Sequence, residues 1–135
     1  VPDICGIYTG ARAYKALKDE KMSIDIKSVS KKGISGTITY SNTGQQYTTA
    51  FTGEWKESGS GADVNFHEDE VIEKLNVTSV PLFVYQGGVS KGEIAGSCTF
   101  ITTGRYTYEF NAKKKPAEAE VPIEDPAEPV LPDYE

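Results

Sequence analysis

This chain of 135 residues has little of what enzymes and membrane proteins need. It has one histidine, His67, so any mechanism that pairs histidine with serine or cysteine depends on that side chain. No glycine-rich phosphate loop and no CxxC pair is present. No apolar run approaches the roughly 20 residues of a membrane span. No signal peptide is visible, so a leader was either removed or never made. The sequence therefore predicts a protein that is not an enzyme, does not span a membrane and uses no cofactor.

Charge and proline are unevenly distributed along the chain. Seven of the 20 acidic residues lie beyond Lys115, where there is no Lys or Arg, so residues 1–115 hold 13 acids against 14 bases. A nearly neutral domain does not favour nucleic-acid binding. Five of the seven prolines also lie in 116–135. We expect one domain over 1–115 and a disordered or extended acidic tail over 116–135, although a tail packed along the sheet edge is an alternative.

Strict alternation of apolar and polar residues is the dominant pattern. Met22, Ile24 and Ile26 alternate with polar residues, and the same holds over 62–67 and 105–110. A period of two indicates strands with one wet and one dry face. We predict a mainly β protein, an antiparallel up-and-down meander closing into a small barrel. The expected strands are 4–8, 22–29, 34–40, 46–55, 62–67, 80–86, 89–101 and 105–112.

The expected connections carry turn residues, with glycine supplying positive φ. They are Lys31-Lys32-Gly33, Ser41-Asn42-Thr43-Gly44, Ser58-Gly59-Ser60-Gly61, Gln86-Gly87-Gly88 and Thr102-Thr103-Gly104. Two segments break the alternation. Residues 11–20 have helical spacing, with Thr9 as a cap, and Asp69–Leu75 suits a short helical turn. Within 89–101, Gly92 and Gly96 indicate a bulge or a bend.

The two cysteines lie near the two ends of the β region. If the first and last strands are neighbours, a Cys5–Cys98 disulfide would staple the closure; two buried free thiols are the alternative. The Asn76-Val77-Thr78 triplet is a glycosylation sequon. With the Tyr- and Thr-rich strands, it favours a protein that is secreted or at the cell surface.

Aromatic residues on the expected inward faces are the candidate ligand-binding residues. In a closed barrel such side chains either line a cup for a small ligand or fill the core. The candidates are Tyr40, Tyr47, Phe51, Trp55, Phe83, Tyr85, Tyr106 and Tyr108. The opposite face of 46–55 is small and polar, which suits contact with another macromolecule; its residues are Thr48, Ala50, Thr52 and Glu54.

One acidic cluster could hold a cation. The run His67-Glu68-Asp69-Glu70 offers carboxylates, which suit hard metals such as Ca²⁺, but its spacing matches no EF-hand loop. A solvated acidic turn is the simpler interpretation. We therefore assign no metal ligands and no catalytic residues.

The layout resembles the calycin group, the lipocalins and avidins, whose barrels open with a short Gly-x-Trp strand. The matching piece is Gly6-Ile7-Tyr8, with tyrosine in place of the tryptophan, followed by 22–26 and 34–40. The resemblance covers about residues 4–112 and implies a barrel that binds a small ligand. The single Trp55 argues against an avidin-like biotin site.

Two functions follow as expectations. The first is an exported, monomeric lipocalin-like barrel that binds a small, largely apolar molecule. The alternative is a secreted or surface-exposed module for protein interaction, such as adhesion, with the acidic tail as a spacer.

Overall fold

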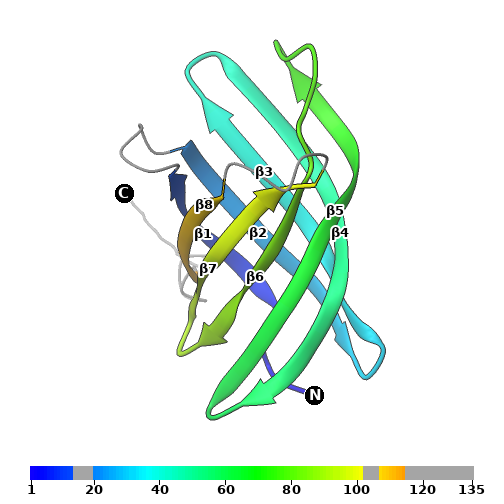
Figure 1. The fold of residues 1–135 in the computed structure, drawn as a ribbon, viewed down its shortest axis with the longest axis vertical. Coiled ribbons are helices and arrows are strands. Elements are labelled where there is room, and N and C mark those ends of the chain that lie inside the picture. The colour runs from blue at the N-terminus through cyan, green and yellow to red at the C-terminus, as the bar shows by residue number, and fades with distance from the viewer. Residues whose placement is uncertain (14–19, 102–106, 115–135) are drawn as a thin grey trace, which may run out of the picture.

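The computed structural model describes residues 1–13, 20–101 and 107–114 (Figure 1). Eight antiparallel strands follow one another along the chain and close into one barrel. They are β1 (Gly6–Ala13), β2 (Glu20–Ser30), β3 (Gly33–Asn42), β4 (Gln45–Ser58), β5 (Gly61–Leu75), β6 (Phe83–Ser90), β7 (Glu93–Phe100) and β8 (Tyr108–Lys114).

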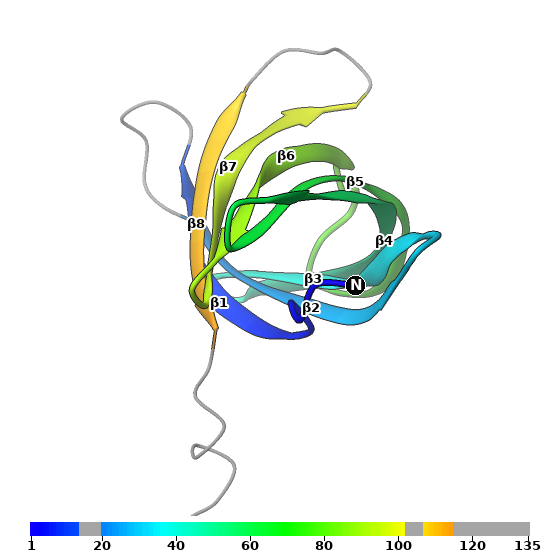
Figure 2. The same cartoon turned by 90° about the horizontal axis from the view of Figure 1, so that it is seen from below.

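The first and last strands close the barrel. β1 pairs with β8 in a register that runs from Tyr8 opposite Lys114 to Ala13 opposite Glu109. Every other strand pairs with the next one along the chain, and Figure 2 shows the strands encircling a common interior. The predicted up-and-down barrel is confirmed.

Alternating side chains build the core as the sequence predicts. Met22, Ile24 and Ile26 of β2 are all buried. Deeper in the barrel the rings of Phe66 and Tyr85 stack with centroids 4.8 Å apart. Burial of apolar area on this scale is the main force that holds such a sheet closed.

The barrel has two chemically different ends. The β2–β3 end, where β2 stops at Ser30, carries the N-terminal segment, and the hydroxyl of Tyr8 donates to the carbonyl oxygen of Ile4 at 2.9 Å. At the same end, Trp55 Nε1 donates to the carbonyl oxygen of Ser30 at 2.6 Å. The opposite end, where β1 stops at Ala13 and β2 starts, is called the β1–β2 end below.

The helix expected over 11–20 is wrong where the structure describes that segment. Residues 11–13 continue β1, and Glu20 begins β2; residues 14–19 lie outside the described part. Ala11 and Arg12 pair with β2 on one side and with β8 on the other, so the strand satisfies their backbone groups from both sides. No local helix competes with that pairing.

The helical turn expected at Asp69–Leu75 is also wrong, because this segment is the second half of β5. The pairing of β4 with β5 shifts twice, so Asp69 and Ile72 are extra residues without a partner opposite them. Each extra residue reverses which side of the strand the next side chain faces. The two bulges therefore erase the period of two from the sequence.

The turn expected at Gln86-Gly87-Gly88 lies inside β6 instead, and the run 89–101 is two strands rather than one. The chain reverses at Lys91 and Gly92, whose φ angles of 53° and 78° suit a two-residue hairpin turn. Gly87 and Gly96 face each other across β6 and β7, and a Cβ on Gly96 would come within 2.0 Å of the Gln86 carbonyl oxygen. Glycine is needed there for close approach of the strands.

The predicted disulfide is not formed. Cys5 is exposed, Cys98 is buried, and both are free. Cys98 lies on β7, opposite Tyr108 at the start of β8, whereas Cys5 precedes Gly6 near the far end of β8. The neighbour of β1 across the closure is β8 rather than β7. Cys98 therefore lies one strand away from β1 and at the opposite end of the barrel from Cys5.

No helix in the described ranges is long and apolar enough to cross a membrane. The predicted tail over 116–135 and the turn at 102–104 lie outside the described residues.

Candidate functional site

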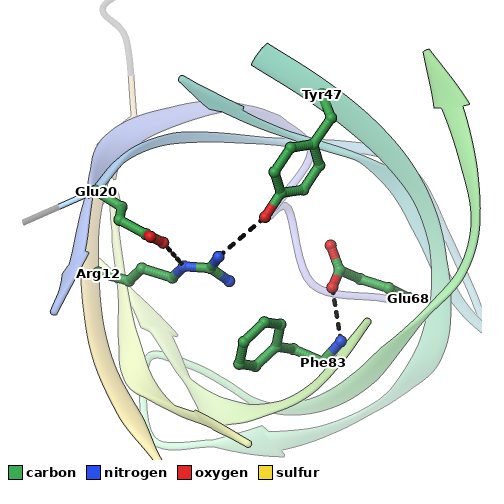
Figure 3. A network of polar contacts seen from close by, with 5 residues as sticks. All are labelled: Arg12, Glu20, Tyr47, Glu68 and Phe83. Carbon is green, nitrogen blue, oxygen red and sulfur yellow. Dashed lines mark hydrogen bonds and ion pairs between the residues drawn. The ribbon is translucent and has the colours of Figure 1, made fainter. Parts of the chain in front are cut away.

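A charged side chain lies inside the β1–β2 end of the barrel. Arg12 is 2% exposed, and its Nε pairs with a carboxylate oxygen of Glu20 at 2.6 Å. Its Nη2 donates to the hydroxyl of Tyr47 at 3.1 Å. Figure 3 shows the guanidinium reaching into the interior between these two partners. A buried arginine is costly unless its charge and its donors are satisfied.

Aromatic rings surround the same guanidinium. Arg12 Cζ lies 3.8 Å from the ring centroid of Tyr40, 4.3 Å from that of Phe83 and 5.0 Å from that of Tyr108. Each of these contacts is within the range of a cation–π interaction. The rings therefore stabilise the charge and hold it in one place.

A buried carboxylate faces Arg12 from the other side of the barrel. Glu68 of β5 is 2% exposed, accepts a hydrogen bond from the backbone N–H of Phe83 at 2.7 Å, and accepts another from Thr49 Oγ1. Burial raises the pKa of Glu68 to about 7, against the opposing effects of its two hydrogen bonds and the Arg12 charge. Burial therefore moves the titration of Glu68 from the acidic range toward neutral pH.

Three buried polar atoms of the described residues make no hydrogen bond of good geometry, although the Tyr85 hydroxyl and the Cys98 thiol both interact with the Arg12 guanidinium. The three atoms are Arg12 Nη1, the Tyr40 hydroxyl and the Tyr85 hydroxyl. The guanidinium nitrogen can only donate, and a tyrosine hydroxyl can donate. Among the described residues, the buried side-chain atoms with incomplete hydrogen bonding thus gather around Arg12, and a hydrogen-bond acceptor would complete it.

A small hollow opens beside these groups. It has a volume of about 60 Å³ and is lined by Glu20, Tyr40, Ser41, Asn42, Gln45 and Tyr47. Three of its lining residues contact Arg12: Glu20, Tyr47 and Tyr40. The hollow therefore lies against three side chains that contact the buried guanidinium, while Arg12 itself does not line it.

The structure separates the predicted ligand-binding residues into three groups. Those around Arg12 are Tyr40, Tyr47, Phe83 and Tyr108. Phe51 and Tyr85 have rings deeper in the barrel: that of Tyr85 stacks on Phe66 with its hydroxyl toward Arg12, and that of Phe51 packs tilted against Phe66. Trp55 lies at the β2–β3 end, and Tyr106 is outside the described residues.

Sequence reasoning missed the polar members of this site. Glu68 continues the inward series Ala62, Val64 and Phe66, so the alternation does carry a signal for it. Arg12 falls on the inward face of β1 together with Tyr8. That signal was hidden by the helix expected over the same residues.

The acidic run at 67–70 is divided by the barrel wall. Glu68 points inward, whereas His67 and Asp69 pair with each other on the outside, with Nδ1 and Oδ1 2.8 Å apart. Within the described ranges, no group of three or more His, Cys, Asp or Glu side chains could hold a metal ion.

No family model matches this chain, and no curated protein matches it. The fold and the site together define a class of protein, a closed eight-strand antiparallel barrel with a buried polar cluster at one end.

Proposed function

We propose that this protein binds a small, largely apolar molecule at the β1–β2 end of its barrel. The observation that carries the proposal is a buried guanidinium and two buried hydroxyls with incomplete hydrogen bonding, set among aromatic rings next to a hollow at the rim. Small-ligand sites combine mainly apolar walls with a few fixed polar groups, and barrel mouths are common places for them.

The composition of this end differs from that of an ordinary core. At the other end of the interior, the buried hydroxyl of Tyr8 has its partner in the Ile4 carbonyl oxygen. At the β1–β2 end, Arg12, Tyr40 and Tyr85 each bury a polar atom that makes no hydrogen bond of good geometry. Apolar residues at these positions would make the folded protein more stable, because an unsatisfied buried polar atom costs about 1–3 kcal/mol.

The finer parts of the proposal are a calycin-like relationship and export from the cell. The eight-strand meander and the opening Gly6-Ile7-Tyr8 support the former. The sequon supports the latter, because Asn76 is exposed on the segment between β5 and β6. Its Nδ2, the atom that would carry a glycan, donates to the carbonyl oxygen of Gly44 at 2.8 Å.

The test is a binding screen read by amide NMR. We would titrate the labelled protein with small aromatic and aliphatic compounds. Residues of the β1–β2 end, such as Arg12, Tyr47 and Phe83, should shift, while Ser30 and Trp55 at the other end serve as the internal control. Saturable shifts confined to the β2–β3 end, or no saturable shift with any compound, would contradict the proposal.

A second candidate, a protein-interaction module, is favoured by one observation. The pairing of β5 with β6 ends at His67 opposite Val84, but β5 continues along β4 to Leu75. Ile72 and Leu75 on this extension are 52% and 60% exposed. Native mass spectrometry of protein purified from its source separates the two candidates, since one predicts a retained small molecule and the other a bound protein.

A further inference from the structure

Glu20 is the most accessible partner of the buried guanidinium. Its side chain is 36% exposed, whereas that of Arg12 is 2% exposed. It is the first residue of β2 and lines the hollow at the rim. A carboxylate in this position can turn outward to water at low cost, which Glu68, buried and held by two hydrogen bonds, cannot do.

We propose that the site binds the carboxylate group of a small organic acid, and that this group takes the place of Glu20 beside Arg12. The inference rests on the proposed function and names its ligand class. In the absence of ligand, Glu20 occupies the position that the acid will take. The buried guanidinium is then paired with a carboxylate in both states.

The donors around Arg12 favour an acid over a neutral ligand. Glu20 meets only the Nε of the guanidinium, and the adjacent Nη2 donates to the neutral hydroxyl of Tyr47. An oxyanion in the place of Glu20 can accept from Nε and the adjacent Nη2, and also from the Tyr40 hydroxyl, which Glu20 leaves unmet. A bidentate carboxylate is the group that matches a guanidinium fork best.

The charges are consistent with an exchange rather than a simple addition. Among the described residues, the charged groups of this interior are Arg12, Glu20 and Glu68, whose pKa burial raises. Adding an anion while Glu20 stays in place would set two or three negative groups against one positive group. Moving Glu20 into water leaves the interior with the same charge before and after binding.

The size of the hollow sets the orientation of the ligand. About 60 Å³ accommodates an acid group better than a long hydrocarbon chain. The carboxylate therefore lies inward against Arg12, and the apolar body lies toward the rim against the rings of Tyr40 and Tyr47.

The experiment compares three probes that share one ring: benzoate, benzyl alcohol and benzylammonium. Affinities are measured by calorimetry at pH 7 in low salt, and the position of each probe by amide NMR. We expect benzoate to bind about tenfold more tightly than benzyl alcohol, and benzylammonium to bind more weakly than either. Binding of benzyl alcohol at this end with equal strength would overturn the acid inference and leave the proposed function standing. Failure of all three probes to shift any residue at this end would count against both.

The variant Glu20→Gln tests the exchange directly. A site residue that only holds ligand or supports the fold should weaken binding when it is changed. If Glu20 competes with the ligand for Arg12, removing its charge should strengthen binding. We therefore expect benzoate affinity to rise about tenfold in this variant. Unchanged or weaker benzoate binding by folded Glu20→Gln protein would refute the exchange.

Glu109→Gln is the matched control. Glu109 is an exposed acid on β8, opposite Ala13 at the same end of the barrel, so its loss changes the net charge equally without touching the interior. Benzoate affinity should change less than twofold there. An equal rise in both variants would mean that general electrostatic attraction, and not exchange with Glu20, sets the affinity.

A spectroscopic signal completes the test. The side-chain carboxyl carbon of Glu20, followed by ¹³C NMR, should shift when benzoate saturates the site and stay in place with benzyl alcohol. A Glu20 signal that does not respond to benzoate would contradict its displacement even if benzoate binds.

Discussion

Arg12 of β1 and Glu68 of β5 extend into the same end of the barrel from opposite walls, and each is held by other partners (Figure 3). The charge of Arg12 lowers the pKa of Glu68, while burial raises it by more, to about 7. An interior with one fixed cation and one carboxyl group that titrates near neutrality responds to pH and to the loss of either partner.

Stability should fall as the pH rises toward neutrality. The pKa of Glu68 is raised from 4.5 to about 7 on folding, so between these values the folded protein binds more protons than the unfolded chain. The contribution of the protonated group is fully present below pH 4.5 and is lost as the pH passes 7. This contribution to the free energy of unfolding is roughly 3 kcal/mol. Denaturant unfolding from pH 4.5 to 8 measures this slope.

The variant Glu68→Gln isolates that effect. Glutamine keeps an oxygen to accept from the Phe83 N–H and carries no charge. The pH slope over this window should largely disappear, and the variant should be more stable than the native protein at pH 8. Glu54→Gln, at an exposed outer position of β4, is the control and should leave the slope unchanged.

Two tyrosine-to-phenylalanine variants should behave in opposite ways. Tyr40→Phe removes a buried hydroxyl that has no partner, so stability should stay the same or rise by about 1 kcal/mol. Tyr8→Phe removes a donor to the Ile4 carbonyl oxygen and should cost about 1–2 kcal/mol. Chemical denaturation compares the two, and a larger loss for Tyr40→Phe would show that its hydroxyl is already satisfied.

Replacing the buried cation should shift the titration of its neighbour. In Arg12→Met, the attraction that lowers the pKa of Glu68 is gone, so that pKa should rise above its native value of about 7. A ¹³C NMR titration of the Glu68 carboxyl group measures the change. A fall in this pKa would contradict the electrostatic link between the two walls.

The two cysteines should differ sharply in reactivity. Cys5 is exposed, whereas burial raises the pKa of the Cys98 thiol to about 12. A thiol reagent at pH 8 should label one site quickly in the folded protein and the second only after unfolding. Intact mass spectrometry counts the labels, and no labelling under native conditions would point to a disulfide instead.

The fold could be predicted from the sequence because most strands of a barrel have one wet and one dry face. The series Met22, Ile24 and Ile26 records that geometry directly. The second half of β5 could not be predicted, since two bulges, at Asp69 and Ile72, shift the alternation. A bulge depends on the partner strand, which local sequence does not contain.

The candidate site was only half predictable. Its aromatic walls, Tyr40, Tyr47 and Phe83, follow from the alternation of apolar residues. Arg12 and Glu68 do not, because a charged residue on an inward face looks like a solvated one until its partners are known. Those partners come from distant strands, as Tyr47 does for Arg12. Long-range pairing of this kind is set by the closed barrel, not by any local segment.

The seam between β1 and β8 also matters while the protein is being made. Arg12 lies opposite Phe110 across that seam, so the wall beside the guanidinium is finished only when the end of the domain has left the ribosome. Until then β1 and β7 are the edge strands of an open sheet, and their unpaired backbone groups can pair with other nascent chains. The interior around Arg12 is therefore enclosed only after β8 has been synthesised and has paired with β1.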